Sequence, residues 1–113
     1  MKLKIFISFW ILVLSLIVIG SILPHFAPTE KYHFDKFVHF VAYFIMSFLP
    51  VIFLKRKDLL FLSLILLTFI SIITEIIQNN IPGRMGSIDD VLTNIIGITM
   101  GFLIGGIIIN LRR

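Results

Sequence analysis

The chain has 113 residues, of which 58% are hydrophobic and 14% are charged, and it contains no cysteine. Soluble domains carry about 25% charged residues, and a short soluble chain cannot bury this much apolar surface. The composition therefore excludes an ordinary soluble domain, a disulfide framework and a thiolate metal site. Most of the formal net charge of +4 lies in short clusters beside apolar runs, which indicates membrane topology rather than nucleic-acid binding.

Four apolar segments follow in chain order, at residues 5–23, 37–54, 59–77 and 91–111. Each has roughly the length of about 20 residues that a helix needs to cross the hydrocarbon core. Helices are required because lipid cannot satisfy exposed backbone groups. We therefore predict an all-α integral membrane four-helix bundle that forms one domain over residues 1–113.

The first segment allows a second interpretation. It follows Lys2 and Lys4 and contains Gly20 near its end, which resembles a signal peptide with a small-residue cleavage site. Its apolar run is longer than a usual signal core, and this length favours a retained helix. Cleavage would leave three membrane spans.

The distribution of Lys and Arg predicts the orientation. With four crossings, both termini and the loop between the second and third segments share one side. Seven basic residues lie on that side: Lys2, Lys4, Lys55, Arg56, Lys57, Arg112 and Arg113. Three lie on the other: Lys31, Lys36 and Arg84. The positive-inside rule therefore places both termini in the cytoplasm.

Three of the predicted helices carry a polar stripe near their outer ends, because these residues recur every three or four positions. The stripes are Asp35, His39 and Tyr43 in the second helix, Thr68, Ser71, Glu75 and Gln78 in the third, and Asp90 and Asn94 in the fourth. An ionisable group facing lipid at a helix centre costs roughly 2.5–3.5 kcal/mol. We therefore expect the stripes to face one shallow outer cavity, in which Arg84 pairs with Glu75 or Asp90.

Simpler roles are available for individual residues. Asp35 is a candidate helix cap, and Ser87 with Asp90 fits a capping box. His39 and Asn94 are candidates for hydrogen bonds between helices. Each of these roles explains one residue, whereas a shared site explains the whole cluster.

The fourth segment also contains a glycine stripe. Gly97, Gly101 and Gly105 form a doubled small-xxx-small motif, which is typical of close helix packing within a chain or in a homodimer. In the second segment, Pro50 has no N–H and therefore removes the helical hydrogen bond to the carbonyl of Met46.

No standard catalytic motif is present. His39, Glu75 and Asp90 have the groups for general acid–base catalysis, or for a metal site with one imidazole and two carboxylates. We expect no bound metal and no cofactor. An enzyme and a binding protein remain alternatives at this point.

Three ordered elements resemble the VanZ-like family. They are D-K-x-x-H-x-x-x-Y at residues 35–43, E-x-x-Q at residues 75–78, and R…D-x-x-x-N-x-x-G at residues 84–97. The resemblance implies a four-helix bacterial membrane protein. It also implies a ligand-binding set onto which the family's shared polar residues map: Asp35, Lys36, His39, Tyr43, Glu75, Gln78, Arg84, Asp90 and Asn94.

The resemblance also implies a function. The family takes its name from a member associated with resistance to teicoplanin, a glycopeptide that carries a lipid tail and acts on cell-wall precursors outside the cytoplasmic membrane. We therefore expect a multi-pass protein of the bacterial cytoplasmic membrane that contacts membrane lipid. It would bind a lipid-linked envelope precursor or a lipophilic glycopeptide and would affect glycopeptide susceptibility.

Two alternatives follow from the same residues. One is an intramembrane enzyme that acts on an envelope lipid phosphate headgroup through His39, Glu75 and Asp90. The other is a structural subunit that forms a homodimer through Gly97 and the two glycines that follow it in the stripe.

Overall fold

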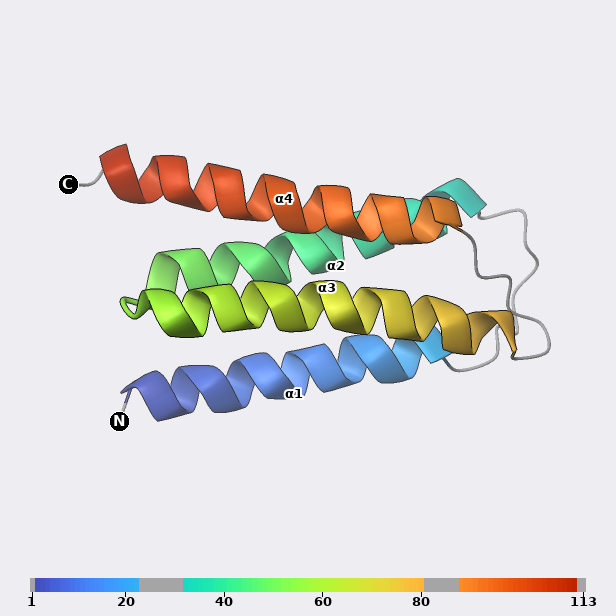
Figure 1. Cartoon of the computed structure of the whole chain (residues 1–113), viewed down its shortest axis with the longest axis horizontal. Helices are drawn as coiled ribbons and strands as arrows, with labels where there is room; N and C mark the ends of the chain where they lie inside the picture. The colour runs from blue at the N-terminus through green and yellow to red at the C-terminus, as the bar shows by residue number, and fades with distance from the viewer. Residues whose placement is uncertain (1, 23–31, 81–87, 112–113) are drawn as a thin grey trace.

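The computed structural model describes residues 2–22, 32–80 and 88–111, and for residues 22, 32–35 and 79 it describes the backbone alone. These ranges contain four helices: α1 (Lys2–Ile22), α2 (Tyr32–Phe53), α3 (Lys57–Asn79) and α4 (Ile88–Leu111). Each is long and apolar enough to cross a membrane (Figure 1). The prediction of an all-α membrane bundle with four spans is confirmed.

The helices extend beyond the predicted apolar segments. α2 begins at Tyr32 and not at residue 37, and α4 begins at Ile88 and not at residue 91. The prediction counted only residues that suit the hydrocarbon core, whereas a helix continues through polar residues for as long as its backbone hydrogen bonds form. The polar residues at these helix starts therefore lie on helices.

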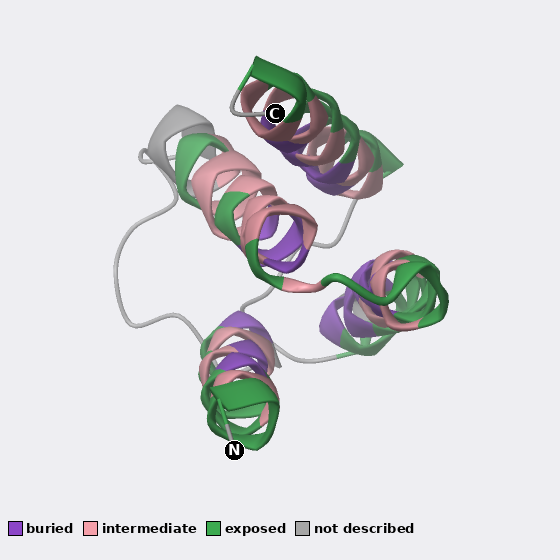
Figure 2. Ribbon diagram, turned by 90° about the vertical axis from the view of Figure 1, so that its left-hand side faces the viewer, coloured by how far each residue is buried: buried purple, intermediate pink, exposed green. Residues whose placement is uncertain are grey.

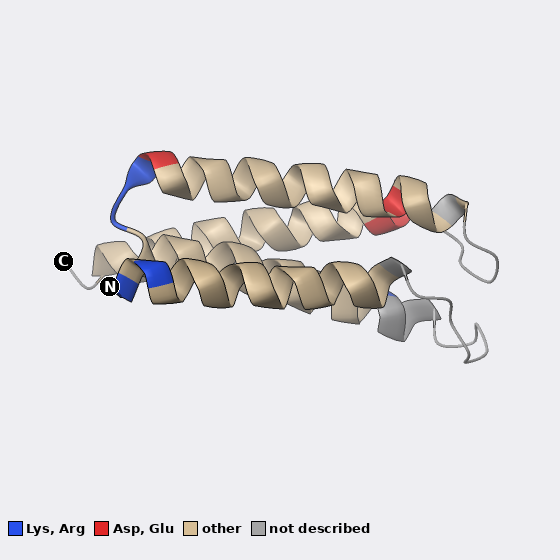
Figure 3. Cartoon of the chain, turned by 90° about the horizontal axis from the view of Figure 1, so that it is seen from below, with Lys and Arg blue, Asp and Glu red and all other residues tan. Residues whose placement is uncertain are grey.

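The two ends of the bundle differ in charge (Figure 3). One end carries the basic residues Lys2, Lys4, Lys55, Arg56 and Lys57 and is called the basic end here. α2 and α3 are joined there by residues 54–56 alone and form a short antiparallel hairpin. Both chain termini lie at this end as well (Figure 1).

The opposite end is called the polar end. It carries the beginnings of α2 and α4 and the end of α3, with Lys36, Glu75, Gln78 and Asp90. The polar residues of the three stripes are therefore gathered at one end of the bundle, away from the basic cluster.

α2 and α4 form the most extensive helix pair, and they run parallel. Lys36 meets Asp90, Phe40 meets Gly97, and Val51 meets Gly105, so the residue numbers rise together along both helices. α1 packs on α2 and α3, and within the described helices it makes no contact with α4. Figure 2 shows the buried faces of the four helices turned toward the bundle interior.

The glycine stripe allows α2 and α4 to approach closely. A Cβ atom at Gly97 would lie 2.7 Å from the carbonyl oxygen of Phe40. At Gly101 it would collide with the Ser47 hydroxyl and the carbonyl oxygen of Phe44. The stripe therefore packs within the chain, as one of the two interpretations of the motif predicted. A homodimer through the same glycines stays a prediction. In this structure α2 covers the surface that such a dimer would use.

The core is centred on Tyr43, Met46 and Leu67, with Trp10 and Leu14 contributed by α1. The indole Nε1 of Trp10 donates a hydrogen bond of 2.9 Å to the carbonyl oxygen of Met46. This carbonyl is the one that Pro50 leaves without its helical partner. α1 is thus fixed to α2 at the position where the proline interrupts the hydrogen bonding of α2.

Candidate functional site

An ion pair joins α2 and α4 at the polar end. The Lys36 ammonium nitrogen lies 3.1 Å from Asp90 Oδ1, and the two side chains are 21% and 17% exposed. The parallel direction of the helices is what brings these residues level, because both lie in the first turns of their helices. The pair is therefore partly exposed and partly buried.

α3 presents a buried polar face toward the other helices. Ser71, Thr74, Glu75 and Gln78 are all buried. Gln78 donates a hydrogen bond of 2.5 Å to the backbone carbonyl of Ser21 in α1. The predicted α3 stripe is therefore an inward face, and Thr74 belongs to it although the sequence analysis did not include it.

Tyr43 and Asn94 are almost fully buried, each 1% exposed. The polar neighbours of the Tyr43 hydroxyl are Thr74 and the Glu75 carboxylate. Among the described residues, neither the Tyr43 hydroxyl nor the Asn94 side-chain oxygen has a hydrogen-bond partner. Buried polar atoms are rarely left unpaired, so these two atoms are candidates for contact with a further group.

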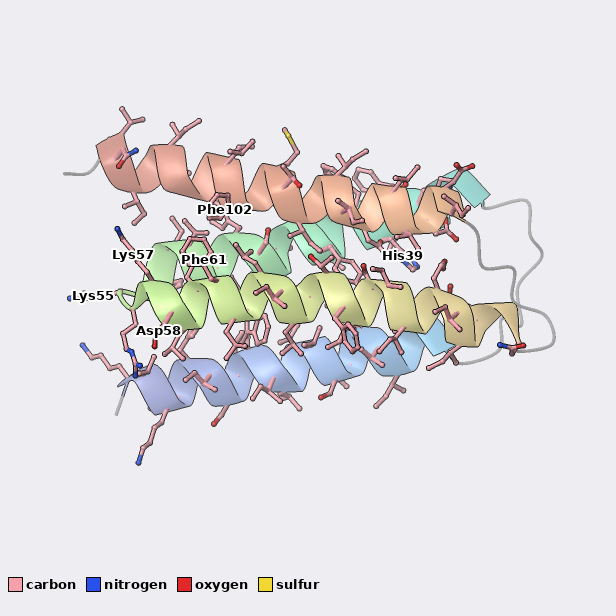
Figure 4. The ribbon with its side chains drawn as sticks, viewed as in Figure 1. His39, Lys55, Lys57, Asp58, Phe61 and Phe102 are labelled. Atoms are coloured by element: carbon pink, nitrogen blue, oxygen red, sulfur yellow. The ribbon has the colours of Figure 1, made fainter. Side chains whose placement is uncertain are left out.

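His39 lies on α2 one turn from Tyr43 and is half-buried. Figure 4 places it toward the polar end, far along the bundle from Lys55 and Lys57. Its position continues the spacing of Lys36 and Tyr43 along the helix. His39 is thus available to a group that enters from the polar end.

The structure therefore gathers much of the predicted ligand-binding set at the polar end. Seven of its members have described side chains there: Lys36, His39, Tyr43, Glu75, Gln78, Asp90 and Asn94. The side chain of Asp35 and the whole of Arg84 lie outside the described residues, so the pairing predicted for Arg84 does too. In the described part of the chain, no three His, Cys, Asp or Glu side chains form a metal-binding group.

Sequence reasoning missed several contributors. Ser47 is fully buried and donates a hydrogen bond of 2.8 Å to the carbonyl oxygen of Ile98, which ties α2 to α4. Its position four residues after Tyr43 continues the α2 stripe, and this spacing was a usable signal. The Ser21 carbonyl had no such signal, because any backbone carbonyl near a helix end has the same chemistry.

The sequence matches the VanZ/LLP1 family over residues 3–109, which is almost the whole chain. The chain belongs to the VanZ/LLP1 family. No curated protein and no solved structure matches it.

The match to VanZ/LLP1 begins in α1 and ends in α4. Within this VanZ/LLP1 bundle, the polar end offers an ammonium, an imidazole and a carboxylate at its rim, from Lys36, His39 and Asp90. Beneath them lie the uncharged donors and acceptors of Tyr43 and Asn94. Such a site can bind a headgroup that carries both charge and hydrogen-bonding groups.

Proposed function

We propose that this VanZ/LLP1 protein lies in the bacterial cytoplasmic membrane with both termini in the cytoplasm and its polar end facing outward. There it binds a lipid-linked cell-envelope precursor or a lipophilic glycopeptide, and it affects susceptibility to glycopeptides of the teicoplanin type. The ligand-binding set consists of the residues gathered at the polar end, together with Asp35 and Arg84, which the family resemblance adds.

The observation that carries this proposal is the Lys36–Asp90 ion pair. Two charged side chains, each about four-fifths buried, are held 3.1 Å apart between two membrane-spanning helices. Charged residues in such segments are costly, and they mark ligand or ion sites when they face the protein interior. The pair can exchange partners with a charged headgroup, because each member is exposed enough to be reached.

The distribution of Lys and Arg supports the proposed orientation. The basic end carries the Lys and Arg excess that favours the cytoplasmic side. The polar end then faces the outer leaflet, where lipid-linked precursors are exposed and where glycopeptides act. A ligand with a lipid tail would keep that tail in the bilayer beside the exposed apolar faces of the helices while its headgroup reaches the rim.

The first experiment measures glycopeptide susceptibility. Lys36→Ala, His39→Ala, Glu75→Gln and Asp90→Ala are compared with wild type in a host that lacks its own copy. We expect each variant to shift the minimal inhibitory concentration of teicoplanin toward that of the empty host. Thr93→Val is the matched control, because Thr93 is adjacent to the site on α4 but its hydroxyl bonds only to its own helix. Unchanged susceptibility in all four variants, at wild-type protein levels, would refute the proposal.

The second experiment tests the orientation. Because the natural chain has no cysteine, single cysteines report accessibility without background. We expect Asp89→Cys to react with an impermeant thiol reagent added outside intact cells, and Lys55→Cys to react only after the membrane is opened. The opposite pattern would place the polar end in the cytoplasm and would remove the outer-leaflet ligand.

The enzymatic alternative is separated by a turnover assay on envelope lipid phosphates with purified protein. Binding without turnover supports the proposal. Turnover that falls by roughly 10²–10⁴-fold in His39→Ala would replace it with the enzyme.

A further inference from the structure

Three helices contribute polar atoms to one level of the bundle, just beneath the rim. We call Tyr43, Glu75 and Asn94 the acceptor layer. On α4, Asn94 lies between Asp90, which is level with Lys36, and Gly97, which is level with Phe40 and Phe44. On α3, Glu75 is an electrostatic neighbour of the Tyr43 hydroxyl. The layer thus takes one residue from each of α2, α3 and α4.

The acceptor layer has more acceptors than donors. The Tyr43 hydroxyl and the Asn94 side-chain oxygen are buried, and among the described residues both are unpaired. The neighbouring hydroxyl of Thr74 gives its proton to the carbonyl of Ser71, at 3.1 Å. The Gln78 amide nitrogen donates away from the layer, to Ser21. The Tyr43 hydroxyl and the Asn94 amide nitrogen can donate, but the Asn94 side-chain oxygen and the Glu75 carboxylate only accept, and a bound group can supply further donors to these oxygens.

The chemistry of these atoms selects the class of group. Carbonyl oxygen and carboxylate repel an anion, so a phosphate does not fit this layer. A divalent cation requires several anionic or carbonyl ligands, and the layer offers a single carboxylate. Glu75 is itself engaged within the protein, so the selection rests on the two unpaired atoms. A group with several N–H donors and a positive charge suits all three residues.

Resting on the proposed function, we propose that the acceptor layer of Tyr43, Glu75 and Asn94 binds a primary ammonium group of the ligand. The ammonium has three N–H donors, and three helices each present one acceptor. A quaternary ammonium has the same charge but no N–H donor, so this layer discriminates against it. Lys36 and His39 at the rim remain available to the rest of the headgroup.

The ammonium has two possible sources, a membrane phospholipid or another amine-bearing ligand such as a precursor or a glycopeptide. The experiment uses the full-length protein in nanodiscs of phosphatidylethanolamine and phosphatidylcholine with identical acyl chains. Native mass spectrometry measures which lipid is retained. In phosphatidylcholine nanodiscs, a parallel titration compares ethanolamine with choline by the midpoint of thermal unfolding.

Tyr43→Phe and Asn94→Leu each remove one acceptor while keeping the size of the side chain. Thr93→Val is the matched control beside Asn94 on α4, because the Thr93 hydroxyl donates to the Asp89 carbonyl of its own helix. We expect wild type and the control to prefer the primary amine by about tenfold, as for a lost charge-assisted hydrogen bond, and both variants to lose that preference. Retention of phosphatidylethanolamine identifies a lipid source. Discrimination of ethanolamine alone identifies another amine-bearing ligand.

The proposal is overturned if wild type does not discriminate in either assay, or if Tyr43→Phe and Asn94→Leu both discriminate as wild type does. The susceptibility assay fails or succeeds separately. Amine discrimination with unchanged susceptibility would retain the ammonium site and remove the glycopeptide role. Altered susceptibility without amine discrimination would do the reverse.

Discussion

The interface between α2 and α4 has two contrasting halves. Toward the basic end it is closed by glycines, and the backbone of Phe44 and the side chain of Val51 lie directly against Gly101 and Gly105. At the polar end the same helices meet through the side chains of the Lys36–Asp90 pair, and the first glycine contact, of Gly97 with the Phe40 backbone, lies further in. Near the basic end the glycines bring the two helices into direct contact. This close packing fixes the positions of the polar side chains at the other end.

This contrast explains how a short chain can keep costly polar residues in a membrane. Without a hydrophobic driving force between helices in lipid, association depends on close packing and hydrogen bonds. The glycine half supplies that packing. The polar half can therefore hold unpaired atoms, such as the Tyr43 hydroxyl, that do not contribute to stability. The four predictions below test this division, from the largest expected effect to the smallest.

The largest loss of stability is expected for Gly101→Leu, in the glycine-packed half of the interface. The new side chain meets the Phe44 carbonyl and the Ser47 hydroxyl, so α2 and α4 must separate. We expect a loss of about 3 kcal/mol or more in unfolding free energy, at the upper end of overpacking costs. Gly106→Leu is the control, because a Cβ there meets nothing within 4 Å. Equal stability of the two variants, measured by unfolding in mixed micelles, would show that the glycine contact does not hold the pair.

In the polar half, Asp90→Ala removes one member of the ion pair and leaves the Lys36 ammonium largely buried. Breaking a fully buried pair costs about 3–5 kcal/mol, and the partial exposure of this pair reduces our expectation to about 1–3 kcal/mol. The same unfolding measurement checks it. Asp89→Ala is the control, since Asp89 is the exposed neighbour on α4. A loss of equal size in the control would contradict the assigned role of the pair.

Tyr43→Phe sharpens the contrast because it acts in the opposite direction. A buried hydroxyl without a partner costs about 1–3 kcal/mol, so its removal should raise the unfolding free energy by about 1 kcal/mol in lipid without a primary amine. Thermal unfolding in phosphatidylcholine checks this. Destabilisation there would show that the Tyr43 hydroxyl is stabilised by a partner within the protein, such as Thr74.

The smallest effect is expected for Asp58→Ala. Asp58 forms an exposed ion pair with Arg56, at 2.6 Å, and it raises the pKa of that guanidinium through a hydrogen bond and charge attraction. Arg56 is protonated at neutral pH with or without Asp58, and exposed pairs contribute little. We expect no measurable change in stability. A loss comparable to that of Asp90→Ala would mean that exposure does not distinguish the two ion pairs.

Much of the fold could be predicted from composition and periodicity. The four spans and the short hairpin follow from apolar length and from the Lys55–Arg56–Lys57 cluster, because lipid leaves few other solutions. The inward face of α3 follows from the spacing of Ser71, Glu75 and Gln78. Helix starts were less accurate, since polar residues such as those at the beginning of α2 give no apolar signal.

The pairing within the site could not be read from the sequence. The stripes indicated which faces turn inward, but not that Lys36 would meet Asp90, because this depends on the parallel register that the glycines set. The role of α1 was also underestimated. Its apolar sequence gave no sign that the Trp10 indole would donate to the Met46 carbonyl or that the Ser21 carbonyl would accept from Gln78. Both hydrogen bonds depend on a partner from another helix.

The hydrogen bond from Trp10 to Met46 has a consequence for the divergence of related chains. Pro50 has no N–H to donate to the Met46 carbonyl, and the Trp10 indole N–H donates to that carbonyl instead. In a chain with another residue at position 50, the backbone N–H of that residue can donate to the Met46 carbonyl. A tryptophan in α1 is then no longer required for this hydrogen bond. The two positions should therefore change together, and a double-mutant cycle between Trp10→Phe and Pro50→Ala should reveal coupling between α1 and α2.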